Sequence, residues 1–182
     1  MNQLDVQTQT ENEAVSLKIA VLTLSDTRTL AEDRSGDTLV KLLEESGHQL
    51  IARDIILDDI YKIRAVVSQW IADTNVQVIL TTGGTGFSGR DLTPEALRPL
   101  FDTEIEGFGE TFRQVSFQEI GSSTVQSRAL AGLANRTAIF CLPGSTGACK
   151  TAWKNILQEQ LDSRHRPCNF VGILLQGKQL HS

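Results

Sequence analysis

Short apolar runs alternate with amphipathic segments along most of this chain, and that alternation constrains its fold more than any other feature. Runs of strand length occupy residues 17–25, 48–57, 76–82 and 136–142. Between them apolar residues recur at helical spacing, as Ile63, Val67 and Trp70 do. Strands that alternate with helices are typical of a largely parallel sheet covered on both faces. We therefore expect an α/β fold, a three-layer sandwich with a mostly parallel central sheet and helices on both faces.

Capping residues mark where helices begin between these runs. Ser35 is a candidate N-cap for a helix over residues 36–46, and Thr93 with Pro94 opens another helix. The other expected elements are a mainly helical stretch over 106–132 that breaks near Gly121, a helix over 147–160 and a short strand over 170–175. Residues 1–16 are polar without periodicity, which predicts a disordered N-terminal tail before a single domain over residues 17–182.

Size and charge exclude several classes of protein. A chain of 182 residues and 20.0 kDa is one domain, large enough to bury a core without disulfides or metals. A net charge of -5 argues against nucleic acid as the main partner, and no apolar run is long enough to predict a membrane span. The polar start does not resemble a signal peptide. The three cysteines (Cys141, Cys149 and Cys168) lack CxxC spacing, which is typical of reduced thiols in a cytoplasmic protein.

Two of the apolar runs end in glycine-rich loops, where open α/β sheets bind their ligands. The first loop is Thr81-Thr82-Gly83-Gly84-Thr85-Gly86, and the second is Pro143-Gly144-Ser145-Thr146-Gly147. Free backbone N–H groups and hydroxyls in such loops suit phosphate oxygens. The alternative for the first loop is a tight turn that needs only a flexible backbone. In the second loop, Ser145 or Thr146 is expected to cap the following helix, whether or not a ligand binds.

Acidic residues follow two of the expected strands. Asp91 lies in Gly89-Arg90-Asp91-Leu92-Thr93, where it can support the helix that begins at Thr93 or hold Mg²⁺ beside phosphate groups. Asp58 and Asp59 follow the run over residues 48–57 and can add a metal ligand or start the next helix. From the residues alone, both pairs of alternatives stay open.

The remaining candidates carry weaker signals. Arg128, which follows Ser127, can pair with a phosphate or with a carboxylate. For Ser35, the role of starting a helix is favoured over that of contacting a ligand. The three histidines lack metal-ligand spacing, and Cys141 lies in an apolar run, which indicates packing rather than catalysis.

Five motifs occur in one order that is specific as a set. They are TTGGTG, RDLTPEA, IEGFGETFR, STVQSRALAG and LPGSTGACKTAWKNIL, and together they resemble the MoaB/Mog family of molybdenum cofactor biosynthesis proteins over residues 17–170. The resemblance implies a mixed sheet, trimers or a hexamer of two trimers, and binding of molybdopterin, a pterin dithiolene with a terminal phosphate. It also implies adenylylation of that phosphate with ATP and Mg²⁺, the activity of one branch of the family.

Site residues follow from the resemblance motif by motif. Asp91 matches the essential acidic position of the family, and Asp58 matches the aspartate of a Pro-Asp motif whose proline is Leu57 here. Both would be catalytic residues that hold Mg²⁺. The expected substrate-binding residues are Thr82, Gly83, Gly84, Thr85, Gly86, Ser127, Pro143, Gly144, Ser145 and Thr146.

Two other functions compatible with the same resemblance are a non-catalytic molybdopterin carrier and an oligomeric scaffold of the pathway. We also expect self-association through threefold contacts. The segment over residues 106–120 carries Phe108, Phe112 and Phe117, more aromatic surface than one helix face is expected to bury within its own chain.

Overall fold

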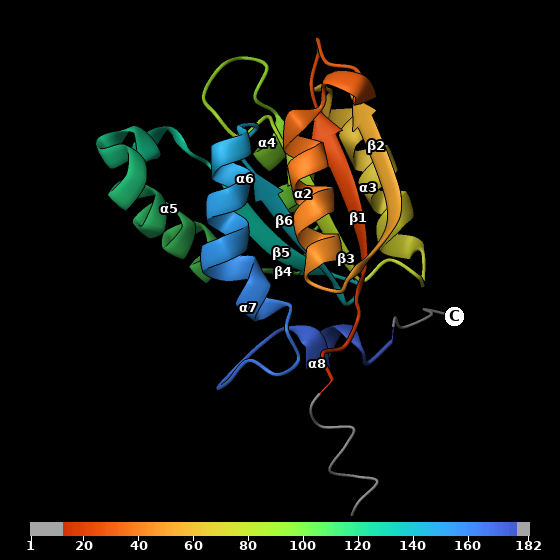
Figure 1. Ribbon diagram of the computed structural model, residues 1–182. Helices are drawn as coiled ribbons and strands as arrows, with labels where there is room; N and C mark the ends of the chain where they lie inside the picture. Colours follow the sequence, from red (N-terminus) through yellow and green to blue (C-terminus); the bar gives the residue numbers. More distant parts are fainter. Residues whose placement is uncertain (1–12, 178–182) are drawn as a thin grey trace, which may run out of the picture.

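Six strands form one mixed sheet in the computed structural model, which describes residues 13–177 (Figure 1). The strands are β1 (Lys18–Leu24), β2 (Gln49–Ile56), β3 (Val78–Thr82), β4 (Thr103–Glu104), β5 (Leu130–Ala134) and β6 (Thr137–Leu142). Their order in the sheet is β2-β1-β3-β6-β5-β4. The first four strands of that order pair in parallel, whereas β5 and β4 run antiparallel to their neighbours. The expected mostly parallel, mixed sheet is confirmed.

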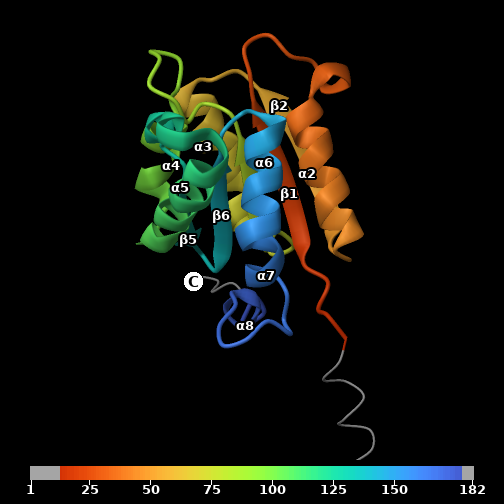
Figure 2. The same ribbon diagram turned by 60° about the vertical axis from the view of Figure 1, so that its left-hand side comes forward.

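Helices cover both faces of this sheet. They are α2 (Arg34–Glu45), α3 (Ile60–Ala72), α4 (Thr93–Leu97), α5 (Glu106–Ile120), α6 (Thr146–Ala152), α7 (Gln158–Gln160) and α8 (Val171–Leu174). Short turns of other helix types are η1 (Leu30–Glu32), η2 (Arg98–Leu100), η3 (Gly121–Gln126) and the π-helical η4 (Trp153–Leu157), which joins α6 to α7. Figure 2 shows α2, α5 and α6 over one face, with α3 behind the sheet. No helix within residues 13–177 is long and apolar enough to cross a membrane.

Two separate cores result from the alternation of side chains along each strand. Val21 and Leu80 point into the core beneath α2, α5 and α6, whereas Leu22 and Ile79 point into the core beneath α3 and α4. All four side chains are fully buried. Strands buried on both faces must be apolar at successive positions, which is why β1, β3 and β6 are recognisable in the sequence as continuous aliphatic runs.

The stretch over residues 106–132, expected to be mainly helical with a break near Gly121, does break there, but its last part forms a strand and not a helix. The chain leaves α5 at Gly121, which has a φ of +58°, passes through η3 and enters β5, which pairs antiparallel with β6. The LAGLA sequence of β5 has none of the β-branched or aromatic residues that favour strands. A Cβ on Gly132 would lie 2.2 Å from the ring of Phe101, so close packing against this aromatic ring accounts for the small residue.

Two other local expectations need correction. Residues 170–175 contain the helix α8 instead of a strand, because Val171 and Leu174 bury the same helix face and the Asn169 side chain accepts a hydrogen bond from the Val171 amide at 3.0 Å. The N-cap of α2 is Asp33, whose carboxylate accepts from the Gly36 amide, while the Ser35 hydroxyl donates to Asp33.

The N-terminal tail expected over residues 1–16 lies mostly outside the described residues. Within the described part, Val15 packs against the core and its amide donates to the Ser163 hydroxyl at 3.0 Å. The phenylalanines of α5 divide between core and surface: Phe108 and Phe112 are buried within the chain, whereas Phe117 is 58% exposed. The aromatic argument for self-association therefore depends on Phe117 alone.

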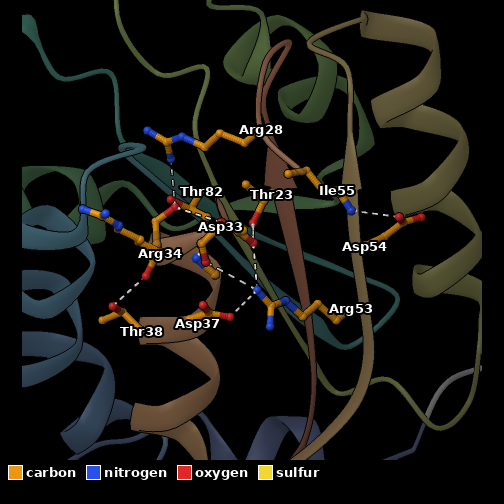
Figure 3. Close-up of polar contacts among 12 residues, drawn as sticks. Thr23, Arg28, Asp33, Arg34, Asp37, Thr38, Arg53, Asp54, Ile55 and Thr82 are labelled. Atoms are coloured by element: carbon orange, nitrogen blue, oxygen red, sulfur yellow. Dashed lines mark hydrogen bonds and ion pairs between the residues drawn. The ribbon is translucent and has the colours of Figure 1, made fainter. Parts of the chain in front are cut away.

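A buried carboxylate ties together β1, β2 and the start of α2 (Figure 3). Asp33 is fully buried and accepts from the Thr23 hydroxyl at 2.7 Å and from the Gly36 amide at 2.9 Å. The Arg53 guanidinium from β2 lies 3.0 Å from Asp33 and 2.7 Å from Asp37. Asp33 therefore fixes the end of the loop that connects β1 to α2.

We predict that Asp33→Ala lowers the free energy of unfolding by about 3–5 kcal/mol, because it removes a helix cap and leaves Arg53 with one partner. The matched variant is Asp37→Ala, which removes the other partner of Arg53. The Asp37 side chain is 59% exposed, so we expect a loss below about 1 kcal/mol. Urea unfolding of both variants measures the difference, and similar losses would contradict the central role of Asp33.

Candidate functional site

A pocket of about 680 Å³ opens where β1, β3 and β6 end, at the upper edge of the sheet in Figure 1. Its floor consists of the Gly83–Gly86 segment after β3, and the segment from Pro143 after β6 forms one side. Helix α5 with η3 forms the opposite wall. Parallel strands place the loops at their carboxyl ends at one edge, which is why these distant segments meet. The volume is in the range of small-molecule sites.

The first glycine loop is packed so tightly that side chains are excluded. Gly83 has a φ of +113°, and a Cβ there would lie 2.3 Å from the carbonyl oxygen of Leu24 in β1. Gly84 has a φ of +64°, and a Cβ there would lie 2.6 Å from the Asp58 carboxylate. Both positions thus require glycine for structural reasons, whatever the loop binds. A larger residue at Gly84 would disturb the Asp58 carboxylate as well, and one at Gly83 would displace the backbone of β1, so neither substitution can isolate ligand binding.

The two glycine loops hold each other in place. The Gly83 amide donates to the Leu142 carbonyl at 3.0 Å, and the Thr82 hydroxyl donates to the Pro143 carbonyl, also at 3.0 Å. The Ser145 hydroxyl caps α6 by accepting from the Ala148 amide, as the sequence predicts. Thr82 is fully buried and does not line the pocket.

The structure places the other expected binding residues as follows. Thr85, Ser127, Pro143, Gly144 and Ser145 line the pocket, together with the Gly83–Gly86 loop. Thr146 lies in a neighbouring hollow instead, beside Arg34.

The aspartates after β2 have separate roles. Asp59 caps α3 by accepting from the amides of Tyr61 and Lys62, each at 2.9 Å. Asp58 is 8% exposed, lines the pocket and accepts from the Leu92 amide at 3.3 Å. The helix cap and the candidate metal ligand are therefore adjacent residues with different partners.

Asp91 lines the same pocket. Its carboxylate accepts from the Ser88 amide at 2.8 Å, inside its own turn, while Leu92 occupies the N-cap position of α4. These hydrogen bonds therefore do not show Asp91 supporting that helix.

The two carboxylates differ in their preference for a proton. Burial raises the pKa of Asp58 to about 6, and the negative charges of Asp26 and Asp91 act in the same direction. Burial also acts to raise the pKa of Asp91, but its hydrogen bonds with Ser88 outweigh that effect and keep the pKa below its ordinary value. Asp26 is paired with Arg90, whose Nε lies 2.8 Å away. A like-charged pair of this kind is a candidate site for a cation.

We predict that Asp58→Asn stabilises the metal-free protein at pH 8. The folded-state pKa of Asp58 lies above its ordinary value of 3.8, so its contribution to stability is fully present below pH 3.8 and is lost as the pH rises through about 6. After solvent screening we expect a gain of about 1 kcal/mol at pH 8 and a smaller gain at pH 5.

The measurement is urea unfolding with a chelator present. Asp59→Asn is the control, because it removes the adjacent charge while keeping a helix cap, and its effect should be small and similar at both pH values. If Asp58→Asn changes the free energy of unfolding by the same amount at pH 5 and pH 8, the raised pKa of Asp58 is contradicted.

The side chain of Arg128 bonds to several groups of the protein itself. Its Nε donates to the Gly86 carbonyl at 2.7 Å, one terminal nitrogen donates to the Asp91 carbonyl at 2.6 Å, and the other pairs with Glu95. The guanidinium also lies over the Phe87 ring, 5.2 Å from its centroid. Of the two alternatives for Arg128, the carboxylate partner is the one present. The arginine holds both ends of the 86–91 loop that carries Asp91.

We predict that Arg128→Lys loosens this loop, because an ammonium group cannot reproduce the planar fork that meets two carbonyls and a carboxylate. The amide protons of Ser88 and Asp91 should exchange at least about tenfold faster. The control is Arg113→Lys, since Arg113 donates to the Ala129 carbonyl and makes no contact with the loop in the described structure. Unchanged exchange in Arg128→Lys would show that the loop is held by its own turn.

Several pocket residues were not among the residues expected from the sequence, and three of them have polar side chains that make hydrogen bonds within the site. Arg28 follows β1, Glu119 belongs to α5, and Thr151 belongs to α6. Arg28 reaches the Gly144 carbonyl at 3.4 Å, and the Thr151 hydroxyl lies 2.7 Å from Glu119. None of them belongs to a glycine loop or an acidic motif. These residues can be identified only from the fold, which brings α5 and the loop after β1 to one pocket.

Known proteins are similar to this chain over most of its length. The family model described as "Probable molybdopterin binding domain" matches residues 20–163. Molybdenum cofactor biosynthesis protein B of Escherichia coli (strain K12) is 55% identical over 162 residues, which are 89% of this chain and 95% of that protein. A crystal structure of molybdenum cofactor biosynthesis protein B is 42% identical, has a TM-score of 0.79 and is aligned over 81% of this chain and 92% of that chain.

A second solved structure is the tungsten cofactor synthesizing protein MoaB from Pyrococcus furiosus. It is 37% identical, has a TM-score of 0.71 and is aligned over 79% of this chain and 92% of that chain. The chain belongs to the MoaB/Mog family of molybdenum cofactor biosynthesis proteins, which the order of its motifs indicates and the family match confirms.

Proposed function

We propose that this protein binds molybdopterin in the pocket and transfers the adenylyl group of ATP to its terminal phosphate, with Mg²⁺. The observation that carries the proposal is that two glycine loops and the carboxylates of Asp58 and Asp91 meet in one pocket. Glycine-loop N–H groups suit the phosphates of both substrates, and the carboxylates suit a cation between them. The family description supports the pterin as ligand.

The donor set fits magnesium. Mg²⁺ is usually held by one or two carboxylates and completed by substrate phosphates and water. Residues 13–177 contain no group of three or more His, Cys, Asp or Glu that could form a cage around a metal, but two carboxylates of the required kind line the pocket. Burial of Asp58 near Asp26 and Asp91 leaves negative charge that a cation would neutralise, and the pKa of about 6 reflects this.

The residues of the site would act by position and charge. A phosphate oxygen of molybdopterin attacks the α-phosphorus of ATP, a new P–O–P linkage forms and pyrophosphate leaves, so no protein nucleophile is required. The glycine-loop amides would hold phosphates in line, and Arg28 would add positive charge beside Gly144. Magnesium, when bound, neutralises charge that develops on the phosphate oxygens. Asp58 and Asp91 would hold it there.

We predict that Asp91→Asn lowers the single-turnover rate of pyrophosphate release from Mg-ATP and molybdopterin by about a hundredfold or more, because a carboxylate ligand loses its charge. Molybdopterin affinity measured without ATP should stay within about twofold, a change of less than 0.5 kcal/mol. The control is Glu44→Gln, an exposed carboxylate on α2 that does not line the pocket.

Two outcomes separate the proposal from its alternatives. Equal rates in wild type and Asp91→Asn would exclude a catalytic role for this carboxylate. A wild type that binds molybdopterin but releases no pyrophosphate would instead be a non-catalytic carrier. If the wild type binds neither substrate, the oligomeric scaffold is the function that remains.

We also propose that the protein works in the cytoplasm as a homo-oligomer built on threefold contacts. Its three cysteines are free, which is typical of reducing compartments. Phe117 and Val125 expose 58% and 70% of their surface on α5 and η3, an apolar area of the kind that contacts between subunits cover. Light scattering at micromolar concentration should give three or six times the chain mass of 20.0 kDa. A monomer would contradict this proposal.

A further inference from the structure

The charged residues that line the pocket are distributed unevenly. Arg28, Arg90, Asp58 and Asp91 all belong to the loops at the ends of the strands, where the glycine-loop amides also lie. The opposite wall, formed by α5 and η3, contributes one charged side chain among the described residues, Glu119. The glycine-loop end of the pocket thus suits phosphates and a cation, and the helical wall presents a single carboxylate.

The surroundings of Glu119 are partly apolar and partly fixed. Phe112 and Ile120 line the same wall, and Ala148 lines the pocket from α6. Thr151 is 5% exposed, and its hydroxyl lies 2.7 Å from Oε2 of Glu119. A carboxylate held in this way beside apolar surface has its orientation restricted, and it lacks an ion-pair partner among the described residues. It can accept hydrogen bonds from a ring that packs on the apolar residues.

The part of the proposed substrate that lies away from the phosphate has a matching chemistry. A pterin ring presents its 2-amino group and its N3–H side by side, two donors pointing in the same direction. A carboxylate offers two oxygens at a compatible spacing, so the pair can form two parallel charge-assisted hydrogen bonds. The flat faces of the ring suit the exposed apolar surface of Ile120.

We propose that Glu119 selects the pterin ring by accepting hydrogen bonds from its 2-amino group and N3–H, while Thr151 orients the carboxylate. This inference rests on the proposed function for the identity of the ligand and adds the residue that determines specificity for its ring. The site recognises the two ends of the ligand by different means, the phosphate by backbone amides and the ring edge by a carboxylate.

The test compares two ring probes that carry no phosphate, pterin and lumazine, in the absence of ATP and Mg²⁺. Lumazine has a carbonyl oxygen at C2 where pterin has an amine, so it faces a carboxylate with an acceptor. Wild type should bind pterin at least about tenfold more tightly than lumazine, because the analogue leaves the carboxylate with an unmatched partner. Binding is measured by titration calorimetry or by the intrinsic fluorescence of the probes.

Variants locate the preference. Glu119→Gln replaces one acceptor oxygen by an amide donor, so pterin affinity should fall by about tenfold, while lumazine affinity should not fall, because the amide N–H can donate to its C2 carbonyl. Thr151→Val should reduce the preference for pterin by a smaller factor. Glu110→Gln is the matched control, because Glu110 lies on the same helix and does not line the pocket, and it should behave as wild type.

The outcomes are distinct from those of the catalytic test. A preference for pterin that persists in Glu119→Gln would overturn the inference, and so would equal affinities for the two probes in wild type or no binding of pterin at millimolar concentration. A preference that depends on Glu119 supports it, even in a protein that releases no pyrophosphate. In that case the ring site stands and the proposed transfer of the adenylyl group fails.

Discussion

The close approach of backbone at Gly83 and Gly84 is the constraint on which the site depends. At Gly83 the chain passes so near the Leu24 carbonyl that no side chain fits, and its amide is bonded to Leu142. At Gly84 the backbone lies against the Asp58 carboxylate, with a left-handed conformation that glycine adopts without strain. The ends of β1, β3 and β6 and Asp58, two residues after β2, therefore converge on one loop. The pocket exists because these four chain segments share that small volume.

This convergence has an electrostatic cost that the proposed chemistry uses. Asp58 is held in a partly desolvated position near two other carboxylates, which raises its pKa to about 6. Such a group destabilises the metal-free protein at neutral pH and gains most when a cation arrives. The net charge of -5 is then compatible with anionic ligands, because oriented amides and a bound cation supply local positive potential. The Asp58 side chain thus lowers the stability of the metal-free protein and favours the binding of a cation.

The sequence predicted those features that have local physical causes. Strands buried on both faces are continuous aliphatic runs, so the parallel part of the sheet was recognisable, as was the Ser145 cap. Strand β5 was missed because its small residues are explained by the packing of Phe101 on Gly132, a contact between separate elements. Asp33 and Ser35 are both good caps by type, and only burial of the Arg53 ion pair distinguishes them. Glu119 lies on α5 beyond the IEGFGETFR motif, and only the fold brings it to the pocket.

The central claim is that a divalent cation and nucleotide phosphates meet between the Gly83–Gly86 loop and the carboxylates of Asp58 and Asp91. The most direct measurement adds Mn²⁺ with ATP to isotope-labelled protein and records paramagnetic broadening of backbone amide signals. The account predicts selective broadening of the amides of Gly84 and Gly86 and of both aspartates. It also predicts that signals of α8, at the opposite end of the molecule in Figure 1, stay sharp. Broadening centred elsewhere, or none at the glycine loop, would contradict the account.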